Sequence, residues 1–340
     1  MIDINRLPTA IGKDSTELLD ILLREEYGYL PSRPYSVEAV IEKRNKKFCA
    51  GKAVLLTLRL TCKADFGEFS FPLYYVSPVG REKVPCFIHI NFRDLIPDMY
   101  QPTEELVDNG YATLTFCYKD VTSDNGDFTD GLAGVIYKDG KREPDACGKI
   151  GLWAWAAMAV MDYAQTLPEL DKEKICVVGH SRLGKTALLT GAIDKRFYCA
   201  FSNDSGCSGA SLSRENTGET IRAITDTFPY WFCENYYKYA DNEEKLPFDQ
   251  HWLIGANIPH KVYVASAEGD AWACPENEYR ACIAASEYYK ANGMKGFVYE
   301  NDTPAVGEQL GEGDIGYHMR RGLHFLSRED WLYYIKYLNF

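Results

Sequence analysis

One serine lies in a turn whose sequence favours nucleophilic catalysis. Residues 175–189 read as an apolar strand, a turn that holds Ser181 between Gly179 and Gly184, and then an apolar helix. A nucleophile elbow has this layout, because its sharp strand-to-helix turn exposes the serine hydroxyl and its glycines let strand and helix approach closely. The N–H groups at the start of the helix then face the oxyanion that forms on a carbonyl oxygen. The pattern predicts that Ser181 is the nucleophile of an acyl transfer.

The same turn also fits the phosphate-binding loop of nucleoside triphosphatases. Residues 179–186 satisfy G-x-x-x-x-G-K-[ST], with Lys185 in the lysine position. Leu183 stands where the commonest elbow pattern, G-x-S-x-G, has its second glycine. The turn nevertheless comes late in the chain, has no glycine in its middle, and is followed by no apolar run that ends directly in a magnesium-holding aspartate. We favour the nucleophile and keep a P-loop nucleotide-binding protein and a purely structural turn as alternatives.

A nucleophilic serine needs a general base, and the chain contains six histidines. Behind an elbow of this kind the acid comes next in the chain and the histidine last. His324 precedes residues 327–330, a helix-capping signature that opens an amphipathic C-terminal segment, so it is the expected base. His318 also follows a predicted strand, residues 296–300, and is the second candidate. We interpret His89 and His180 as structural residues, and His251 and His260 flank the end of the segment 205–259.

Two aspartates are candidates for the acid that orients the histidine. Asp270 follows the predicted strand 261–267, and Asp204 follows the predicted strand 198–202. Either carboxylate would hold the imidazole tautomer that leaves Nε2 free to accept the serine proton. A strand-end aspartate also commonly caps a turn, so the choice between the two stays open.

The remaining pattern predicts a mostly parallel sheet flanked by helices. Alternating apolar and polar residues at 53–61 and 68–75 predict an antiparallel hairpin. Short continuous apolar runs predict strands buried on both faces at 85–90, 112–116, 174–178, 198–202 and 261–267. Apolar residues recur at helical spacing in 104–109, 152–165, 184–194 and 276–292. Alternation of strands and helices predicts one α/β domain over residues 1–340.

Two segments depart from this alternation. Residues 205–259 begin with many glycines and serines and continue into an aromatic run, and we expect them to form a lid inserted between two strands. Most of their aromatic rings are expected to pack internally, with Trp231 the candidate for ligand contact. Residues 1–50 are expected to form an N-terminal extension.

Composition limits the partners of the protein. A net charge of −12 repels polyphosphates and anionic membranes, so neither nucleic acid nor a membrane is expected as a partner. The start of the chain has no apolar signal-peptide core, and eleven cysteines without C-x-x-C spacing indicate reduced core residues, so we expect a cytoplasmic protein. Histidines and cysteines are not clustered at zinc spacings, and we expect no metal and no cofactor.

The elbow at residues 181–185, S-R-x-G-K, resembles that of the glucuronoyl esterases, carbohydrate esterase family 15, and of related hydrolases labelled acetyl xylan esterases. Further segments agree with that group: 27–31, 203–207, 214–219, 246–251, 315–320 and 322–324. The resemblance runs from about residue 20 to the C-terminus. It implies an α/β-hydrolase fold with an inserted lid, and hydrolysis of a small-molecule or oligosaccharide ester through an acyl-enzyme on Ser181.

The resemblance also implies roles for single residues. Arg182 is expected to bind the oxyanion through its N–H group and its guanidinium, and N–H groups near residues 91–93 are expected to assist it. Lys185, Glu219 and Trp231 match positions that contact the uronic sugar, and the acid of the family matches either Asp204 or Asp270. An acetylesterase acting on small acetylated sugars and a catalytically inactive binding module remain alternatives, and the oligomeric state stays open.

Overall fold

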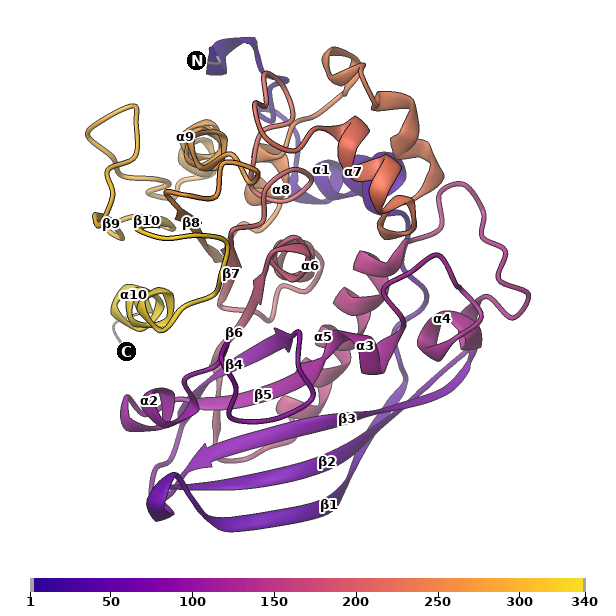
Figure 1. The fold of residues 1–340 in the computed structure, drawn as a ribbon, viewed down its shortest axis with the longest axis vertical. Helices are drawn as coiled ribbons and strands as arrows, with labels where there is room; N and C mark the ends of the chain where they lie inside the picture. The colour runs from indigo at the N-terminus through magenta and orange to yellow at the C-terminus, as the bar shows by residue number, and fades with distance from the viewer. Residues whose placement is uncertain (1–2, 339–340) are drawn as a thin grey trace.

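A computed structural model describes residues 3–338 of the protein, in which one twisted sheet carries helices on both faces (Figure 1). Within these residues the strands follow the order β1-β2-β3-β5-β4-β6-β7-β8-β10-β9. Their bounds are β1 (Ser36–Phe48), β2 (Ala53–Ala64), β3 (Gly67–Pro78), β4 (Val84–Asn91), β5 (Ala112–Cys117), β6 (Leu170–His180), β7 (Cys199–Asn203), β8 (Lys261–Ala267), β9 (Gln309–Leu310) and β10 (Ile315–Arg320).

The centre of the sheet is parallel, from β5 through β4, β6, β7 and β8 to β10. These strands are buried almost throughout, as expected of continuous apolar runs covered by helices on both faces. The predicted hairpin is also confirmed, because β2 pairs with β3 in unbroken antiparallel register from Ala53 opposite Pro78 to Ala64 opposite Gly67. The predicted fold class, a mostly parallel sheet flanked by helices, is therefore correct.

Helices α5, α6 and α9 cover one face of the sheet, with α8 packed against α6 and α9, and α2 and α10 cover the other face (Figure 1). The helix bounds are α1 (Ser15–Leu22), α2 (Thr103–Asp108), α3 (Tyr118–Val121), α4 (Gly131–Ile136), α5 (Lys149–Ala164), α6 (Arg182–Ile193), α7 (Ile221–Thr227), α8 (His251–Gly255), α9 (Pro275–Ala291) and α10 (Arg328–Leu338). Shorter helical turns are η1 (Ile4–Arg6), η2 (Leu23–Tyr27), η3 (Cys49–Gly51), η4 (Pro229–Trp231), η5 (Glu234–Tyr239) and η6 (Glu243–Lys245).

The start of α10 shows the predicted capping signature. The Ser327 N–H donates to Asp330 Oδ2 at 2.6 Å, and the Asp330 N–H donates to Ser327 Oγ at 3.4 Å. This reciprocal pair satisfies two backbone donors that a helix start otherwise leaves unpaired. The loop that carries His324 therefore ends at Ser327, and α10 begins at Arg328.

One expectation about strands was wrong, and one strand was not predicted. Residues 296–300 do not form a strand, since only Phe297 bridges to Ile315, and the strand at this edge is β10. The long strand β1 lies in the segment assigned to the N-terminal extension. Its outer half carries exposed charged residues on both faces, so it lacks the alternation that indicates a strand, although such charges are typical of edge strands.

The segment between β7 and β8 holds α7, η4, η5, η6 and α8 rather than a simple crossover helix. It includes the residues 205–259 that were expected to form a lid. Among residues 3–338, no helix combines the length and the apolar content that a membrane span requires. All eleven cysteines are free, and ten of them are buried.

Candidate active site

Ser181 occupies the sharp turn between β6 and α6. Its backbone has φ 57° and ψ −126°, a conformation that residues other than glycine seldom adopt and that costs on the order of 1–3 kcal/mol. The Ser181 N–H donates to the Asn203 carbonyl at 2.8 Å, and its own carbonyl accepts the Gly184 N–H at 2.8 Å. Gly179 permits this turn, because a Cβ atom there would lie 2.0 Å from the Leu183 carbonyl oxygen. The sequence around Ser181 thus builds the expected elbow.

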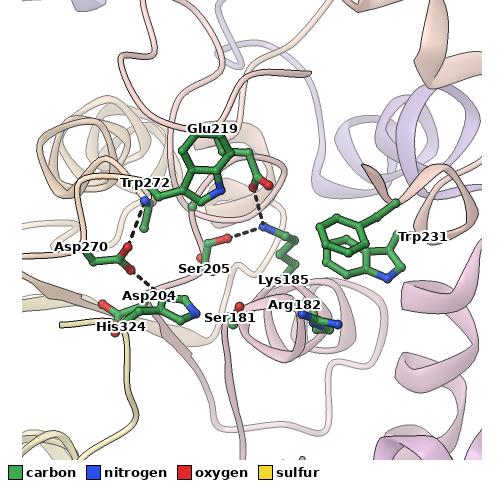
Figure 2. Close-up of a pocket in the computed structure, with 13 residues that line it drawn as sticks. Ser181, Arg182, Lys185, Asp204, Ser205, Glu219, Trp231, Asp270, Trp272 and His324 are labelled. Atoms are coloured by element: carbon green, nitrogen blue, oxygen red, sulfur yellow. Dashed lines mark hydrogen bonds and ion pairs between the residues drawn. The ribbon is translucent and has the colours of Figure 1, made fainter. Parts of the chain in front are cut away.

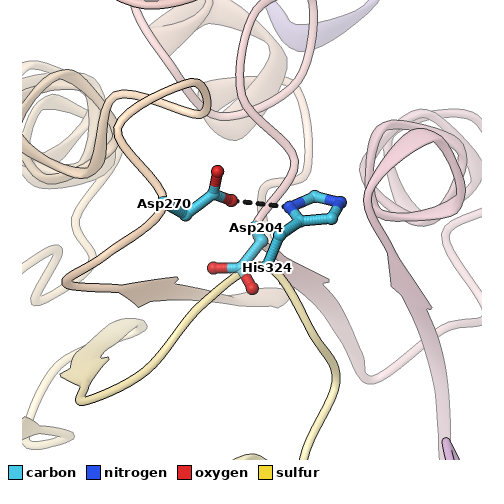
Figure 3. A group of neighbouring side chains, drawn as sticks. All are labelled: Asp204, Asp270 and His324. Atoms are coloured by element: carbon cyan, nitrogen blue, oxygen red, sulfur yellow. Dashed lines mark hydrogen bonds and ion pairs between the residues drawn. The ribbon is translucent and has the colours of Figure 1, made fainter.

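His324 lies on the loop between β10 and α10 and is hydrogen bonded to Asp270 (Figure 3). Its Nδ1 is 2.6 Å from Asp270 Oδ2. The Asp270 side chain is only 6% exposed, whereas that of His324 is 45% exposed. In Figure 2 the second ring nitrogen points to the side of the cavity on which Ser181 lies. A histidine oriented in this way can accept the serine proton at Nε2.

Asp204 lies beside the same pair but bonds to the backbone of the histidine loop. Its Oδ2 accepts the Phe325 N–H at 3.2 Å and a hydrogen bond from the Arg320 guanidinium at 3.3 Å, while its buried Oδ1 has no hydrogen-bond partner within residues 3–338. Burial raises the pKa of Asp204 well above its usual range, and the nearby Glu278 and Asp330 raise it further against the opposing effect of Arg320. Asp204 therefore supports the loop that carries His324, whereas Asp270 orients the ring.

Asp204, Asp270 and His324 also form the one group of three histidine, cysteine or carboxylate side chains, among residues 3–338, whose ligand atoms all lie within 4.8 Å (Figure 3). Nδ1 of His324 is engaged with Asp270 in a hydrogen bond in this group. The arrangement thus matches that of a histidine held by carboxylates.

His318, the second candidate base, is not brought to Ser181. It lies within β10 and is fully buried, with Nδ1 2.9 Å from the Tyr263 hydroxyl and Nε2 2.9 Å from Asp330 Oδ1. Its ring stacks on Tyr333, with 4.2 Å between centroids. Because β10 extends through residue 320, His318 is a core residue of the strand and only His324 follows on the loop.

Eight of the predicted site residues line one cavity of about 310 Å³: Ser181, Arg182, Lys185, Asp204, Glu219, Trp231, Asp270 and His324 (Figure 2). It is bounded by the elbow, the loops after β7, β8 and β10, and the segment between β7 and β8. The lining residues are Ser181, Arg182, Lys185, Asp204, Ser205, Gly206, Glu219, Phe228, Trp231, Asp270, Trp272, Ala273 and His324.

Lys185 and Glu219 form the polar wall of the cavity. The Lys185 ammonium donates to the Ser205 and Cys207 carbonyl oxygens, each at 2.5 Å, and lies 3.9 Å from Glu219 (Figure 2). Both side chains are buried. The ammonium is thus committed to the loop after β7 and does not fold back over the elbow as the lysine of a phosphate-binding loop does, which argues against the P-loop alternative.

Arg182 and Trp231 lie together at the other side of the cavity, and both contact Asp124. The guanidinium carbon of Arg182 is 4.7 Å from the centre of the Trp231 ring, and the guanidinium pairs with the Asp124 carboxylate. The Trp231 indole donates to Asp124 at 2.8 Å. Sequence reasoning missed Asp124, as it missed Ser205 and Trp272. The signal available was the turn-rich stretch 122–130 after a buried strand, since polar residues there collect near active sites of α/β folds.

The N–H donors expected near residues 91–93 are not brought to Ser181. The Phe92 N–H donates to the Asn91 side chain at 2.8 Å, and none of these three residues lines the cavity. Phe92 instead places its ring 5.7 Å from the Arg182 guanidinium. The start of α6 remains as the source of backbone donors, because the first N–H groups of a helix have no acceptor within it.

Known proteins resemble this chain over most of its length. The family model for fungal glucuronyl esterases matches residues 61–293. A carbohydrate esterase from an unknown prokaryotic organism is 40% identical over 238 residues, which cover 69% of this chain and 55% of that protein. The 4-O-methyl-glucuronoyl methylesterase of Podospora anserina is 26% identical over 290 residues, which cover 82% of this chain and 55% of that enzyme. The chain thus spans little more than half the length of these relatives.

Two solved structures resemble the protein along nearly its whole length. The glucuronoyl esterase from Solibacter usitatus has a TM-score of 0.88 and 29% identity, covering 96% of this chain and 92% of that one. A promiscuous esterase of carbohydrate esterase family 15 from a marine bacterial metagenome has a TM-score of 0.86 and 30% identity, covering 96% of this chain and 91% of that one. With its elbow, its sheet and a family match over more than half its length, the protein belongs to the glucuronyl esterase family.

Proposed function

We propose that the protein is a serine carboxyl-ester hydrolase that cleaves esters of glucuronic acid through an acyl-enzyme on Ser181. The observation that carries this proposal is the shared cavity, which the half-buried elbow serine lines together with the hydrogen-bonded pair His324 and Asp270. The names of the relatives, which include glucuronoyl methylesterases, support the substrate class.

In the first step His324 acts as general base. Because its Nδ1–H donates to Asp270, its Nε2 carries the free lone pair and accepts the Ser181 hydroxyl proton. The serine oxygen attacks the ester carbonyl carbon, and the alcohol leaves with the proton that His324 returns. In the second step a water molecule loses its proton to the same nitrogen and attacks the acyl-enzyme, which releases the uronic acid and restores Ser181.

Two features of Arg182 stabilise the oxyanion in this mechanism. Its backbone N–H is the first of α6 and has no helical acceptor, so it is available to the developing negative charge. Its guanidinium lies in the same cavity and adds a fixed positive charge to a site that is partly closed to water. Together they favour the charged transition state over the neutral ester.

The remaining cavity wall suits a uronic sugar. Glu219, which lies 3.9 Å from the Lys185 ammonium, provides an acceptor for a sugar hydroxyl, and Trp231 with Phe228 provides an aromatic face. The Glu219 side chain is buried, so a ligand lacking the matching hydroxyl would leave its carboxylate without full hydrogen bonding. This explains why we place a glucuronoyl group, rather than a small acetyl group, in the cavity.

Hydrolysis of a methyl glucuronate ester and of p-nitrophenyl acetate, by wild type and Ser181→Ala, tests the proposal. We expect turnover of the glucuronate ester that is lost in the variant by about 10³-fold or more. Preference for the acetate would favour the acetylesterase alternative. If the wild type turns over neither ester and instead binds magnesium-ATP, the proposal is wrong.

A further inference from the structure

The carboxylate of Asp124 joins three separate segments of the chain. Oδ1 accepts the Trp231 indole N–H at 2.8 Å, and Oδ2 accepts the Tyr118 hydroxyl at 2.9 Å and pairs with the Arg182 guanidinium. The Tyr230 hydroxyl donates to the Asp124 backbone carbonyl at 3.1 Å. The Asp124 side chain is only 8% exposed. One buried anion thus connects the elbow helix to the aromatic segment 228–231 that closes one side of the cavity.

Lys149 of α5 contacts the loop that carries Asp124 on both sides of that residue. The Lys149 ammonium, which is fully buried, donates to the Thr122 hydroxyl at 2.7 Å and to the Asp127 carbonyl at 2.6 Å. It also lies 3.5 Å from Asp130, which accepts the Thr122 hydroxyl at 3.1 Å. Contacts on both sides of Asp124 therefore tie this loop to the core, and the position of its carboxylate is set before any substrate binds.

The guanidinium of Arg182 has few other restraints. Its charged carbon lies 4.7 Å from the Trp231 ring, 5.4 Å from Phe228 and 5.7 Å from Phe92. Its buried Nε has no hydrogen-bond partner among the described residues. Trp231 and Phe228 stack face to face, with 3.9 Å between centroids and 4° between planes. Aromatic faces attract a cation but do not fix its rotation, whereas a charge-assisted hydrogen bond does.

We propose that Asp124 is a positioning residue for ester hydrolysis. Its carboxylate holds the Arg182 guanidinium beside Ser181 and holds Trp231 in the cavity wall. One side chain thus fixes the positions of the residue that stabilises the oxyanion and of the aromatic ring that contacts the sugar. This inference rests on the proposed function. A preorganised charge stabilises the transition state without the cost of reorienting it during the reaction, so loss of the anion lowers kcat more than it raises KM.

The test compares Asp124→Asn with Asp127→Asn on the methyl glucuronate ester. Asparagine at 124 keeps an oxygen for the Trp231 indole but has no charge for Arg182. Asp127→Asn is the matched control, because Asp127 lies on the same loop and, among the described residues, its carboxylate accepts hydrogen bonds from Thr129 alone. We expect Asp124→Asn to lower kcat roughly 10- to 100-fold, with KM changed by less than about threefold, and Asp127→Asn to behave as wild type.

A second comparison ties the effect to Arg182. If the anion acts through the guanidinium, Asp124→Asn added to Arg182→Ala lowers kcat no further than Arg182→Ala alone. If Asp124→Asn fails to fold, Trp231→Phe tests the same role by removing the hydrogen bond from the Trp231 indole to the Asp124 carboxylate. This variant removes one donor from the carboxylate, and we expect it to lower kcat several-fold and to weaken the effect of Arg182→Lys.

The outcomes separate this inference from the proposed function. Suppose that the wild type turns over the ester and that this turnover depends on Ser181. An unchanged kcat in Asp124→Asn then rejects the positioning role but not the proposed function. The same holds if the losses in kcat from Asp124→Asn and Arg182→Ala multiply independently in the double variant. A rise in KM at constant kcat also rejects it, since that result assigns Asp124 to binding. Absence of wild-type turnover on the glucuronate ester rejects both.

Discussion

The imidazole of His324 and the carboxylate of Asp270 are joined by a 2.6 Å hydrogen bond across 54 positions of the chain. Asp270 ends the turn after β8, and His324 lies on the loop after β10, the neighbouring parallel strand. Because the carboxyl ends of parallel strands meet at one edge of a sheet, loops that are distant in sequence supply both partners. The pair then faces the serine that follows β6 at the same edge.

Asparagine substitution should separate the two aspartates near His324. We expect Asp270→Asn to lower kcat on the glucuronate ester by about 10²- to 10⁴-fold, because an amide can donate to Nδ1 and favour the wrong tautomer. Asp204→Asn should lower kcat less than about tenfold. Burial already raises the pKa of Asp204, so a neutral side chain is tolerated there. Steady-state kinetics of the two variants decides, and an equal loss in both would contradict this assignment.

Removal of His324 should mainly lower kcat, whereas removal of His318 should mainly lower the free energy of unfolding. His324→Ala is expected to lower kcat by about 10³-fold or more and to change the free energy of unfolding by less than about 0.5 kcal/mol, because the ring is half exposed. His318→Ala is expected to lower the free energy of unfolding by about 2–4 kcal/mol, since it removes a buried side chain that hydrogen bonds to both Tyr263 and Asp330. Urea unfolding and kinetics on the same samples test this. A folded His318→Ala with no turnover would make His318 the base.

Glu219→Gln tests whether the polar wall recognises the sugar. A lost hydrogen bond between a charged group and a sugar hydroxyl is expected to lower kcat/KM on the glucuronate ester about 10- to 100-fold. Turnover of p-nitrophenyl acetate, which has no sugar, should change little. Parallel assays on the two esters measure this difference. Equal losses on both would mean that Glu219 only supports the fold around Lys185.

Glu26 should make the stability of the protein depend on pH. It is buried in η2, where the Gln250 amide donates to both of its oxygens at 3.1 Å, and burial raises its pKa from 4.5 to about 8. Between these values the unfolded chain has lost a proton that the folded protein keeps. The stability contributed by this group is therefore complete below about pH 4.5 and is lost as the pH rises to about 8.

Glu26→Gln removes this titration. The variant should gain stability relative to wild type between pH 5 and pH 8, by on the order of a few kcal/mol in the free energy of unfolding. Glu25→Gln is the matched control: hydrogen bonds from Lys238, Tyr239 and Arg24 outweigh burial and lower the pKa of Glu25, so its contribution changes only in more acidic solution. Urea unfolding at several pH values measures both. A constant difference between Glu26→Gln and wild type would refute the buried, protonated state.

Much of the fold could be predicted because its signals are local. The β2–β3 hairpin follows from alternation within each strand, and the parallel strands follow from short apolar runs between helical patterns. One element was predicted wrongly and one was missed where the local pattern was not decisive. The outer half of β1 is charged and exposed on both faces, and residues 296–300 have apolar residues but too few pairing partners to form a strand.

The sequence by itself determined the elbow, because the turn at Ser181 depends on neighbours such as Gly179, whose missing side chain leaves room for the Leu183 carbonyl. Only the tertiary structure decided which acid bonds to His324, because both aspartates follow strands at the same edge of the sheet. It alone brought in Asp124, whose partners Arg182 and Trp231 lie 58 and 107 positions away. Contacts of this kind depend on how the loops and the segment between β7 and β8 pack together, and no local pattern records that packing.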